Sequence, residues 1–439
     1  MRALPQPSEL RVATLGPGRH PSPLAGGEPF VDEGTRILVG GDTAEVAPFL
    51  AAGAELPAFE QAGPRAELFF EPGALTCGLV TCGGLCPGLN DVIRSIVLRL
   101  TYAYRVRRVV GFRYGYAGLA ADPPQPPMTL APEVVDSIHE HGGTLLGSSR
   151  GPQDLGAMVD TLVRHDVGLL FVIAGDGGLR GASALAVEIA RRGLAIGIVG
   201  VPKTIDNDLL WTSRTFGFAT AVGAARRVVT VAHEEARGVW NGVGLVRLMG
   251  RHAGFIAAGA TLASSEVNFC LVPEVPFDLE GPGGFLAALE ARLDAKHHAV
   301  VVVAEGAAQD VLRAGRPVEH DASGNVKLRD VGVFLRDHIA AYFAARRKDV
   351  PIRYIDPSYT IRSQPTNAFD AQLCLVLGQH AVHAGLAGRT DMLVGVWHDR
   401  STHVPIALAV RDRRRLDPRG DLWQRVLEAT GQPASMTAR

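Results

Sequence analysis

The stretch LAIGIVGV at residues 194–201 is followed directly by PKTIDND at residues 202–208. A short apolar run bounded by turn residues is typical of a buried parallel strand. Open α/β sheets bind ligands at the carboxyl ends of their strands, and here two carboxylates, a hydroxyl, an amide and an ammonium follow the run. The stretch predicts an α/β fold with a loop that can bind and deprotonate a ligand. The alternative is an ordinary surface turn, in which Asp and Asn are common.

The same order of strand, Gly-rich loop and helix recurs on both sides of this stretch, which indicates a parallel sheet with helices on both faces. We expect strands at 75–82, 109–112, 168–174, 196–201, 244–248, 268–272 and 299–304. We expect helices at 213–237, 285–294 and 332–346, the first of them crossing a domain boundary. The predicted fold class is α/β, with two Rossmann-like parallel-sheet domains after an irregular N-terminal extension.

The domain boundaries follow from the same pattern. Frequent Pro and Gly in residues 1–72 predict the extension. Residues 73–212 form the first predicted domain, completed by parts of 363–439, and residues 213–362 form the second.

Composition restricts the class of protein. The chain has 439 residues, of which 47% are hydrophobic and 20% charged, so a disordered or collagen-like chain is excluded. A formal net charge of −1 offers no global field for nucleic acid or an anionic membrane. No apolar run approaches the roughly 18 residues of a membrane helix. Five cysteines, mostly in apolar runs, fit reduced thiols, and we expect a cytoplasmic protein.

Two glycine-rich loops lie between predicted strands and helices. TCGGLCPGLN at 81–90 would let a phosphate approach backbone N–H groups at a helix N-terminus, although a tight turn without ligand would use the same glycines. AGDGGLRGA at 174–182 adds an acid to the glycines. An acid beside a phosphate needs a cation between them, so Asp176 is a candidate Mg²⁺ ligand. The alternative is that Asp176 caps the following helix.

Further loops add cations and an acid at strand ends. GSSRG at 147–151 and MGRHAG at 249–254 each carry one arginine, whose planar fork suits phosphate. Glu305 ends another predicted strand and could accept hydrogen bonds from sugar hydroxyls. Tyr359 and Arg362 are three residues apart, so one helical turn would place them on the same side. Together these loops argue for phosphoryl transfer to a hydroxyl.

The motifs resemble those of the 6-phosphofructokinase family, in order, from about Leu75 to about Asn367. They are GGLCPGLN, GSSRG, GDGGLRGA, PKTIDND, MGRHAGFIA, AEG and IDPSYTIRS. The resemblance implies a cosubstrate domain and a fructose 6-phosphate domain, with Mg²⁺ and ATP as cofactors. It also implies a homodimer or homotetramer that binds neither nucleic acid nor a membrane.

The resemblance also implies a role for each matching residue. Asp206 would be the general base on the sugar 1-hydroxyl, supported by Thr204 and Asp208, with Arg150 and Arg251 completing the catalytic set. Asp176 would hold Mg²⁺. The donor would contact Gly84, Tyr116, Arg150, Gly151, Gly175, Asp176, Gly177 and Gly178. Fructose 6-phosphate would contact Lys203, Thr204, Ile205, Asp206, Met249, Gly250, Arg251, Glu305, Tyr359 and Arg362.

The family divides between ATP and pyrophosphate as donor, and two positions bear on the choice. Gly177 is the ATP-type residue, because an Asp there would crowd and repel an α-phosphate. Lys203 is common in pyrophosphate users and also resembles the ATP-dependent trypanosome and plant branch. Gly178 stands where Ser or Thr is usual, and Gly242 replaces an arginine that reaches a neighbouring subunit in bacterial ATP enzymes.

We therefore expect MgATP as the phosphoryl donor to fructose 6-phosphate in glycolysis, with a pyrophosphate-dependent enzyme as the alternative. A catalytically silent paralogue that binds phosphosugar or nucleotide is a further alternative, against which the retained Asp206, Asp176, Arg150 and Arg251 argue. NAD and lipid kinases share a GGDG-type loop but lack the PKTIDND and MGR motifs. Allosteric effectors and the role of residues 1–70 stay open at the level of sequence.

Overall fold

The structure is a computed structural model that describes residues 4–24, 27, 29–313, 318–320 and 326–437. The chain forms two compact units. The first contains the chain up to Thr204, Leu209–Gly217 and Ser363–Asp412. The second contains Ile205–Asp208, Phe218–Arg362 and the chain from Arg413 onward, a C-terminal part that lies outside the expected 213–362.

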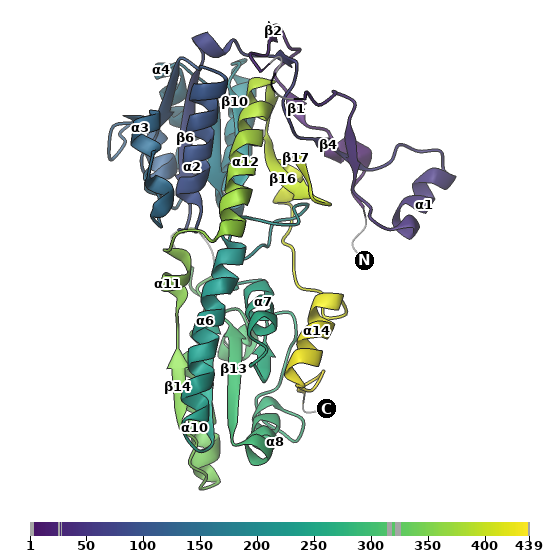
Figure 1. The fold of residues 1–439 in the computed structure, drawn as a ribbon, viewed down its shortest axis with the longest axis vertical. Coiled ribbons are helices and arrows are strands. Elements are labelled where there is room, and N and C mark those ends of the chain that lie inside the picture. Colours follow the sequence, from purple (N-terminus) through teal and green to yellow (C-terminus); the bar gives the residue numbers. More distant parts are fainter. Residues whose placement is uncertain (1–3, 25–26, 28, 314–317, 321–325, 438–439) are drawn as a thin grey trace. The chain divides into compact units, whose positions relative to one another are not determined.

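The first unit is built on a sheet whose strand order is β3-β4-β17-β16-β10-β9-β6-β7-β8 (Figure 1). Its parallel centre consists of β16 (Met392–Trp397), β10 (Gly197–Pro202), β9 (Val167–Ala174), β6 (Thr76–Cys82) and β7 (Arg108–Gly111). Antiparallel strands flank this centre: β17 (Arg400–Pro405), β4 (Ala58–Gln61), β3 (Arg36–Leu38) and β8 (Met128–Thr129).

The register of the central strands decides where the loops meet. Cys82 pairs with Ala174, and Ala174 pairs with Pro202, so β6, β9 and β10 end at the same level. The loops after these strands therefore begin side by side at one edge of the sheet. These loops are three of the glycine-rich or polar segments that the sequence singles out.

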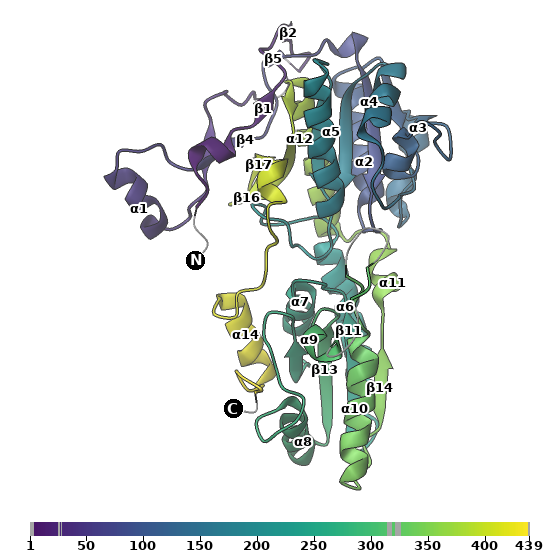
Figure 2. The same ribbon diagram turned by 180° about the vertical axis from the view of Figure 1, so that it is seen from behind.

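Helices cover both faces of this sheet. The helices α2 (Leu89–Leu98) and α12 (Ala368–Leu386) pack together on the face seen in Figure 1. The helices α4 (Leu155–Arg164) and α5 (Asp176–Arg191) lie on the face seen in Figure 2. Beneath them the fully buried Val80, Val172 and Ile198 belong to one hydrophobic core. Shorter elements complete the unit: a π-helical turn at Arg99–Ala103, 3-10 turns at Gly115–Leu119 and Ile138–Glu140, α3 (Pro132–Val135) and α13 (Ile406–Ala409).

The N-terminal extension contains more regular structure than its composition suggests. Its strands β3 and β4 enlarge the main sheet, while β1 (Ala13–Thr14) pairs with β15 (Arg389–Thr390) and β2 (His20–Pro21) with β5 (Glu67–Leu68). It also holds an unexpected helix, α1 (Thr43–Ala51), which Asp42 caps by accepting a hydrogen bond from the Ala44 N–H at 2.8 Å. Two 3-10 turns, Pro7–Leu10 and Pro72–Ala74, complete it.

The second unit is a four-stranded parallel sheet in the order β12-β13-β11-β14. The strands are β12 (Phe269–Leu271), β13 (His298–Ala304), β11 (Gly242–Leu248) and β14 (Ile352–Ile355). On one face lie α6 (Phe218–Arg237) and α7 (Phe255–Ser264), and on the other α8 (Phe285–Lys296) and α10 (Val331–Ala345). The helix α14 (Asp421–Thr430) packs against α7, and α9 (Gln309–Arg313) and α11 (Ser358–Arg362) are short.

The predicted α/β class with parallel-sheet domains is confirmed, and one helix boundary is wrong. The helix expected from Ser213 begins at Phe218, which is also where the longest segment of the second unit begins. Residues before it are held by the first unit, since the Ser213 N–H donates to the Val396 carbonyl at 2.8 Å and Phe216 forms a bridge with Lys203. The helix therefore starts at the boundary instead of crossing it.

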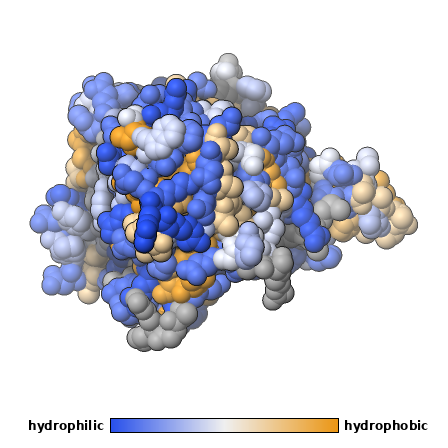
Figure 3. All heavy atoms as spheres, turned by 90° about the horizontal axis from the view of Figure 1, so that it is seen from below, coloured by the Kyte–Doolittle hydropathy of each residue, from blue (hydrophilic) through white to orange (hydrophobic). Residues whose placement is uncertain are grey.

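The surface and the cysteines fit the composition. Hydrophilic residues cover most of the face in Figure 3, with apolar residues scattered among them. Among the residues that the structure describes, no helix is both long and apolar enough to span a membrane. All five cysteines are buried free thiols.

Candidate active site

In the first unit, the end of β6 and the loop that follows it come together with the segment 147–151. The Gly83 N–H donates to the Ser149 carbonyl at 3.2 Å, and the Ser148 hydroxyl donates to the Gly83 carbonyl at 2.6 Å. The Thr81 hydroxyl contacts the Gly147 carbonyl at 2.5 Å. The GGLCPG and GSSRG motifs thus form one hydrogen-bonded layer, and Arg150 is exposed at its rim.

Lys203 supports the same layer from beneath. Its ammonium donates to the Gly84 carbonyl at 2.6 Å, and its backbone N–H donates to the Ala174 carbonyl at 2.9 Å. Only 6% of Lys203 is exposed, so this cation lies under the loop instead of extending into solvent. The loop glycines adopt backbone shapes that few other residues accept, with φ of +90° at Gly83 and +102° at Gly88.

The GDGG motif forms the first turn of α5. The N-cap of this helix is Gly175, so Asp176 occupies the first helical position and the capping interpretation of Asp176 is wrong. The Asp176 carboxylate lies 3.1 Å from the Arg180 guanidinium, and its side chain is 20% exposed. An acid in the first turn is favoured by the helix dipole, and so is a phosphate.

Gly177 and Gly178 differ in their surroundings. A Cβ added at Gly177 would have none of the described atoms within 4 Å, so the space beside it is open. A Cβ added at Gly178 would lie 2.6 Å from the Ala174 Cβ and 3.1 Å from the Cys82 Cβ. The absence of Ser or Thr at position 178 therefore has a steric cause in this chain.

Tyr116 is buried against the same turn. It is 8% exposed, its hydroxyl donates to the Gly178 carbonyl at 2.6 Å, and its ring faces Gly181, where a Cβ would approach within 2.8 Å. In this structure Tyr116 therefore supports the start of α5, and any contact with a nucleotide would be made by the remaining edge of its ring.

The PKTIDND motif passes from one unit to the other. Thr204 is the last residue of its segment in the first unit, and its carbonyl accepts a hydrogen bond from the Thr215 hydroxyl at 2.7 Å. Ile205–Asp208 belong to the second unit, where the Asp208 carbonyl accepts from the Arg414 N–H at 2.7 Å. Asn207 takes a left-handed conformation with φ of +52°, which Asn tolerates, and half-buried Asp206 precedes it.

In the second unit, the MGR and AEG motifs end neighbouring strands and are tied together through their backbones. Leu248 pairs with Ala304, the Glu305 N–H donates to the Leu248 carbonyl at 2.8 Å, and the Gly306 N–H donates to the Gly250 carbonyl at 3.1 Å. Met249 lies between these contacts and is half-buried. The Glu305 carboxylate is thereby placed close to the start of the MGR loop.

The charges around Glu305 have opposite effects on its acidity. Burial raises the pKa of Glu305, whereas the cations Arg247, Arg251 and Arg362 lower it and the Asp356 carboxylate adds to the rise. The result is a raised pKa at a carboxylate surrounded by arginines, an environment common at functional sites. The Arg251 guanidinium also donates to the Val326 carbonyl at 2.6 Å.

Tyr359 and Arg362 lie on the same side of the short helix α11, as their spacing predicts. The Arg362 guanidinium carbon lies 4.9 Å from the centre of the Tyr359 ring. Tyr359 is 76% exposed, so its ring is accessible from solvent.

Two residues that the sequence analysis did not single out organise this half of the site. Arg247 on β11 pairs with Glu305 and Asp356. Glu274, after β12, accepts the Gly254 N–H with both oxygens, at 3.0 and 3.1 Å, and the Leu416 N–H at 2.8 Å. The only signal for either residue was its place beside a strand end.

The single carboxylate of Asp176 fits a Mg²⁺ ion whose other coordinating oxygens come from the bound phosphates and from water. Among the described residues, no group of three His, Cys, Asp or Glu side chains could hold a metal by itself. A single carboxylate beside the open space at Gly177 suits an ion that takes its other oxygens from phosphates and water. Asp176 is therefore the residue that would hold Mg²⁺ in the first unit.

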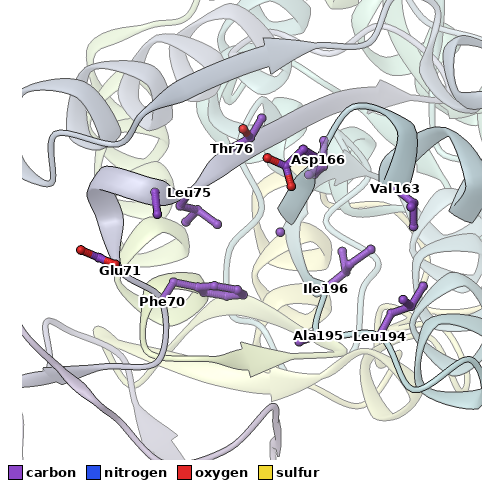
Figure 4. A pocket seen from close by; sticks show the side chains of 12 residues that line it. Phe70, Glu71, Leu75, Thr76, Val163, Asp166, Leu194, Ala195 and Ile196 are labelled. Carbon is purple, nitrogen blue, oxygen red and sulfur yellow. The ribbon is translucent and has the colours of Figure 1, made fainter.

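A pocket on the same unit lies away from these loops. Its lining residues Thr76, Val167 and Ile196 stand at the amino ends of β6, β9 and β10, with Phe70 and Leu75 beside them (Figure 4). The cavity has a volume of about 340 Å³ and a mostly apolar lining. It is at the opposite edge of the sheet from the glycine-rich loops.

Comparison with known proteins places the motifs in a family. Residues 76–385 match the phosphofructokinase family model. The chain is 50% identical to an ATP-dependent 6-phosphofructokinase of Amycolatopsis methanolica, over 98% of this chain and 96% of the relative. It is 48% identical to the ATP-dependent 6-phosphofructokinase of Trypanosoma cruzi, over 84% of this chain and 76% of the relative.

Solved structures share the fold at lower identity. A pyrophosphate-dependent phosphofructokinase from Marinobacter aquaeolei matches with a TM-score of 0.67 and 19% identity, covering 81% of this chain and 91% of that chain. A phosphofructokinase from Pichia pastoris matches with a TM-score of 0.62 and 21% identity, covering 82% of this chain and 37% of that chain. The matched family model and the identity over nearly the whole chain confirm the prediction from the motifs: the chain belongs to the phosphofructokinase family.

Proposed function

We propose that the protein transfers the γ-phosphoryl group of MgATP to the 1-hydroxyl of D-fructose 6-phosphate, giving fructose 1,6-bisphosphate in glycolysis. The observation that carries this proposal is the 50% identity, over 98% of the chain, to a relative named as an ATP-dependent 6-phosphofructokinase. The open space beside Gly177 supports ATP as donor, because a nucleotide extends beyond its second phosphate and needs room there.

The first unit would bind the donor. Backbone N–H groups of the layered loops and the N-terminus of α5 would hold the phosphates, and exposed Arg150 would neutralise charge on the transferred group. When bound, Mg²⁺ offsets the negative charge of the phosphate oxygens, and Asp176 would hold it. The backbone groups assigned to the donor are those of Gly84, Gly151, Gly175, Gly177 and Gly178, with Tyr116 supporting the turn from behind.

The second unit and the shared PKTIDND loop would bind the sugar phosphate. Asp206 would accept the proton of the 1-hydroxyl, with Thr204 and Asp208 holding the loop in shape. Glu305 would accept hydrogen bonds from sugar hydroxyls, and Arg251, Tyr359 and Arg362 would bind the 6-phosphate. The remaining contacts would come from Lys203, Ile205, Met249 and Gly250.

Pyrophosphate is the second candidate donor, because Lys203 places a compact cation directly under the GGLCPG loop. The test is a parallel assay of purified protein with fructose 6-phosphate and Mg²⁺, using ATP in one series and pyrophosphate in the other. We expect a larger kcat/KM with ATP. A clear preference for pyrophosphate would overturn the choice of donor, and no turnover with either donor would overturn the proposed function.

We place this activity in the cytoplasm, where five buried free thiols stay reduced, and in a homodimer or homotetramer. Light scattering on the purified protein measures the oligomeric state. A monomer at the concentrations used in the assay would contradict that assignment.

A further inference from the structure

Arg247 makes ion pairs with residues from three separate segments of the second unit. Its guanidinium lies 3.1 Å from a Glu305 oxygen, contacts an Asp356 oxygen, and lies 3.9 Å from an Asp330 oxygen. The side chain of Arg247 is 15% exposed, and those of Glu305 and Asp356 are 19% and 31% exposed. The Arg247–Glu305 pair is therefore largely buried, and the network reaches the surface at Asp356 and at Asp330, whose side chain is 46% exposed.

The strand register explains why these groups meet. Leu248, the residue after Arg247, pairs with Ala304, and Glu305 follows directly. On the other side, Val246 pairs with Ile355, and Asp356 follows directly. Arg247 thus lies on β11, the strand between β13 and β14. Glu305 directly follows the end of β13, and Asp356 directly follows the end of β14.

The network fixes parts of the site that would otherwise depend on loop conformation. The ion pair holds the Glu305 carboxylate through its Oε2 atom. Asp356 also accepts the Ser358 N–H at 3.0 Å and the Ser358 hydroxyl at 2.5 Å, and Ser358 begins the helix that carries Tyr359 and Arg362. One guanidinium therefore connects the sugar-binding carboxylate with the start of the phosphate-binding helix.

We infer that Arg247 is a positioning residue of the fructose 6-phosphate site, which it serves by holding Glu305 and Asp356 without contacting the substrate. The inference rests on the proposed function. Removing Arg247 leaves the largely buried Glu305 carboxylate without its ion pair, so the loss of Arg247 should disturb Glu305 most strongly. All the ion-pair partners of Arg247 belong to the second unit. Its loss should therefore weaken the binding of fructose 6-phosphate and leave the binding of ATP unchanged.

The test compares Arg247→Met, which keeps side-chain length without charge, with Arg247→Lys, which keeps charge without the planar fork. We expect Arg247→Met to raise KM for fructose 6-phosphate at least tenfold, with KM for ATP within about twofold of wild type. Arg247→Lys should recover part of the loss. The matched control is Arg353→Met, which removes an arginine on neighbouring β14 whose pair with Glu235 is exposed, and it should leave both constants unchanged.

Equal rises in both KM values, or an unchanged KM for fructose 6-phosphate in Arg247→Met, would overturn the inference. If Arg247→Met does not fold, Asp356→Asn removes one of the ion pairs of Arg247 instead. This variant should raise KM for fructose 6-phosphate and leave KM for ATP unchanged. An unchanged KM for fructose 6-phosphate in Asp356→Asn would also overturn the inference. Failure of the proposed function is distinguishable, because in that case the wild type itself would neither turn over fructose 6-phosphate nor bind it in calorimetry.

Discussion

At the scale of single residues, the proposed chemistry depends on a few side chains whose position follows from the ends of strands. Asp206 comes four residues after β10 ends at Pro202, in a turn that Asn207 tightens through its left-handed backbone. A general base must have a fixed direction relative to its substrate, and a short turn anchored to a buried strand provides that direction.

We predict that Asp206→Asn lowers kcat by about 10²–10⁴-fold, because the amide cannot accept the proton of the 1-hydroxyl. Binding of fructose 6-phosphate should change little, since the amide has nearly the same shape as the carboxylate. Steady-state kinetics give kcat, and calorimetry without donor gives the affinity. A variant with the turnover of wild type would contradict the assignment of Asp206 as the base.

We predict that Gly177→Asp selectively damages the use of ATP. The added side chain has room to fit, since none of the described atoms lies within 4 Å of its Cβ, so folding should be preserved. At about 4 Å and an effective dielectric constant near 20, two like charges repel by roughly 4 kcal/mol, which corresponds to about a thousandfold in affinity. Measuring kcat/KM for ATP and pyrophosphate checks this.

The control for this prediction is Gly177→Asn, which has the same size as the Asp variant without its charge. It should lose much less activity with ATP. If the two variants lost activity with ATP equally, the effect would be steric and the argument from charge repulsion would fail.

At the scale of elements, the first turn of α5 shows how packing and ligand binding share the same residues. Gly178 contacts Ala174 and Cys82 so closely that no side chain fits, and its carbonyl accepts the Tyr116 hydroxyl. The helix start is therefore held by contacts from β6, β9 and the 3-10 turn at Gly115–Leu119, which keep its N–H groups pointed at the position proposed for the donor.

We predict that Gly178→Ser destabilises the protein by about 1–3 kcal/mol, because its Cβ would lie 2.6 Å from the Ala174 Cβ. KM for ATP should rise as the turn shifts. Adding Ala174→Gly removes the closer contact and should restore part of the stability, measured by denaturant unfolding. A single variant as stable as wild type would show that the turn adjusts without strain.

At the scale of the whole molecule, the first unit contains a buried histidine, His383, whose neutral form the fold favours. His383 on α12 is 3% exposed, and its Nε2 atom lies 3.4 Å from the Arg99 guanidinium, which can only donate. The proton is therefore on Nδ1, which faces the Tyr104 hydroxyl at 2.7 Å. Burial, together with Arg99 and other cations nearby, lowers the pKa of His383 to about 2.

We predict that this histidine makes the protein sensitive to mild acid. Its pKa is lower in the folded state than in the unfolded chain, near 6.5, so its contribution to stability is present above pH 6.5 and is lost as the pH falls toward 2. One proton corresponds to about 1.4 kcal/mol per pH unit, so the free energy of unfolding should fall by about 2 kcal/mol by pH 5 from this group.

The test is His383→Gln, whose amide can keep both hydrogen bonds without titrating. Between pH 6.5 and 5, the unfolding free energy of this variant should depend less on pH than that of wild type. Comparing the two proteins at pH 8 gives the cost of the substitution itself. Identical pH slopes in the two proteins would mean that His383 does not titrate on unfolding.

The sequence by itself determined the class of fold and the family, and it singled out the loops to which the chemistry is assigned by proposal. Those features are local: a strand is recognised from its own apolar run, and a motif from neighbouring residues such as Asp206 and Gly177. Even the strand ends were predicted to within one residue at β6, β9 and β10. The start of α6 was missed by five residues, because contacts of Ser213 and Phe216 with distant strands hold that segment out of the helix.

Only the tertiary structure decided which distant residues support those loops. Arg247 meets Asp356 across 109 residues, and Glu274 meets Leu416 across 142 residues. Part of the crowding at Gly178 likewise comes from Cys82, which lies on another strand. Such contacts depend on strand order and register, which the periodicity of a single chain does not encode. The pattern along the chain reports which faces are buried, whereas the partners of each face are set by how the sheet assembles.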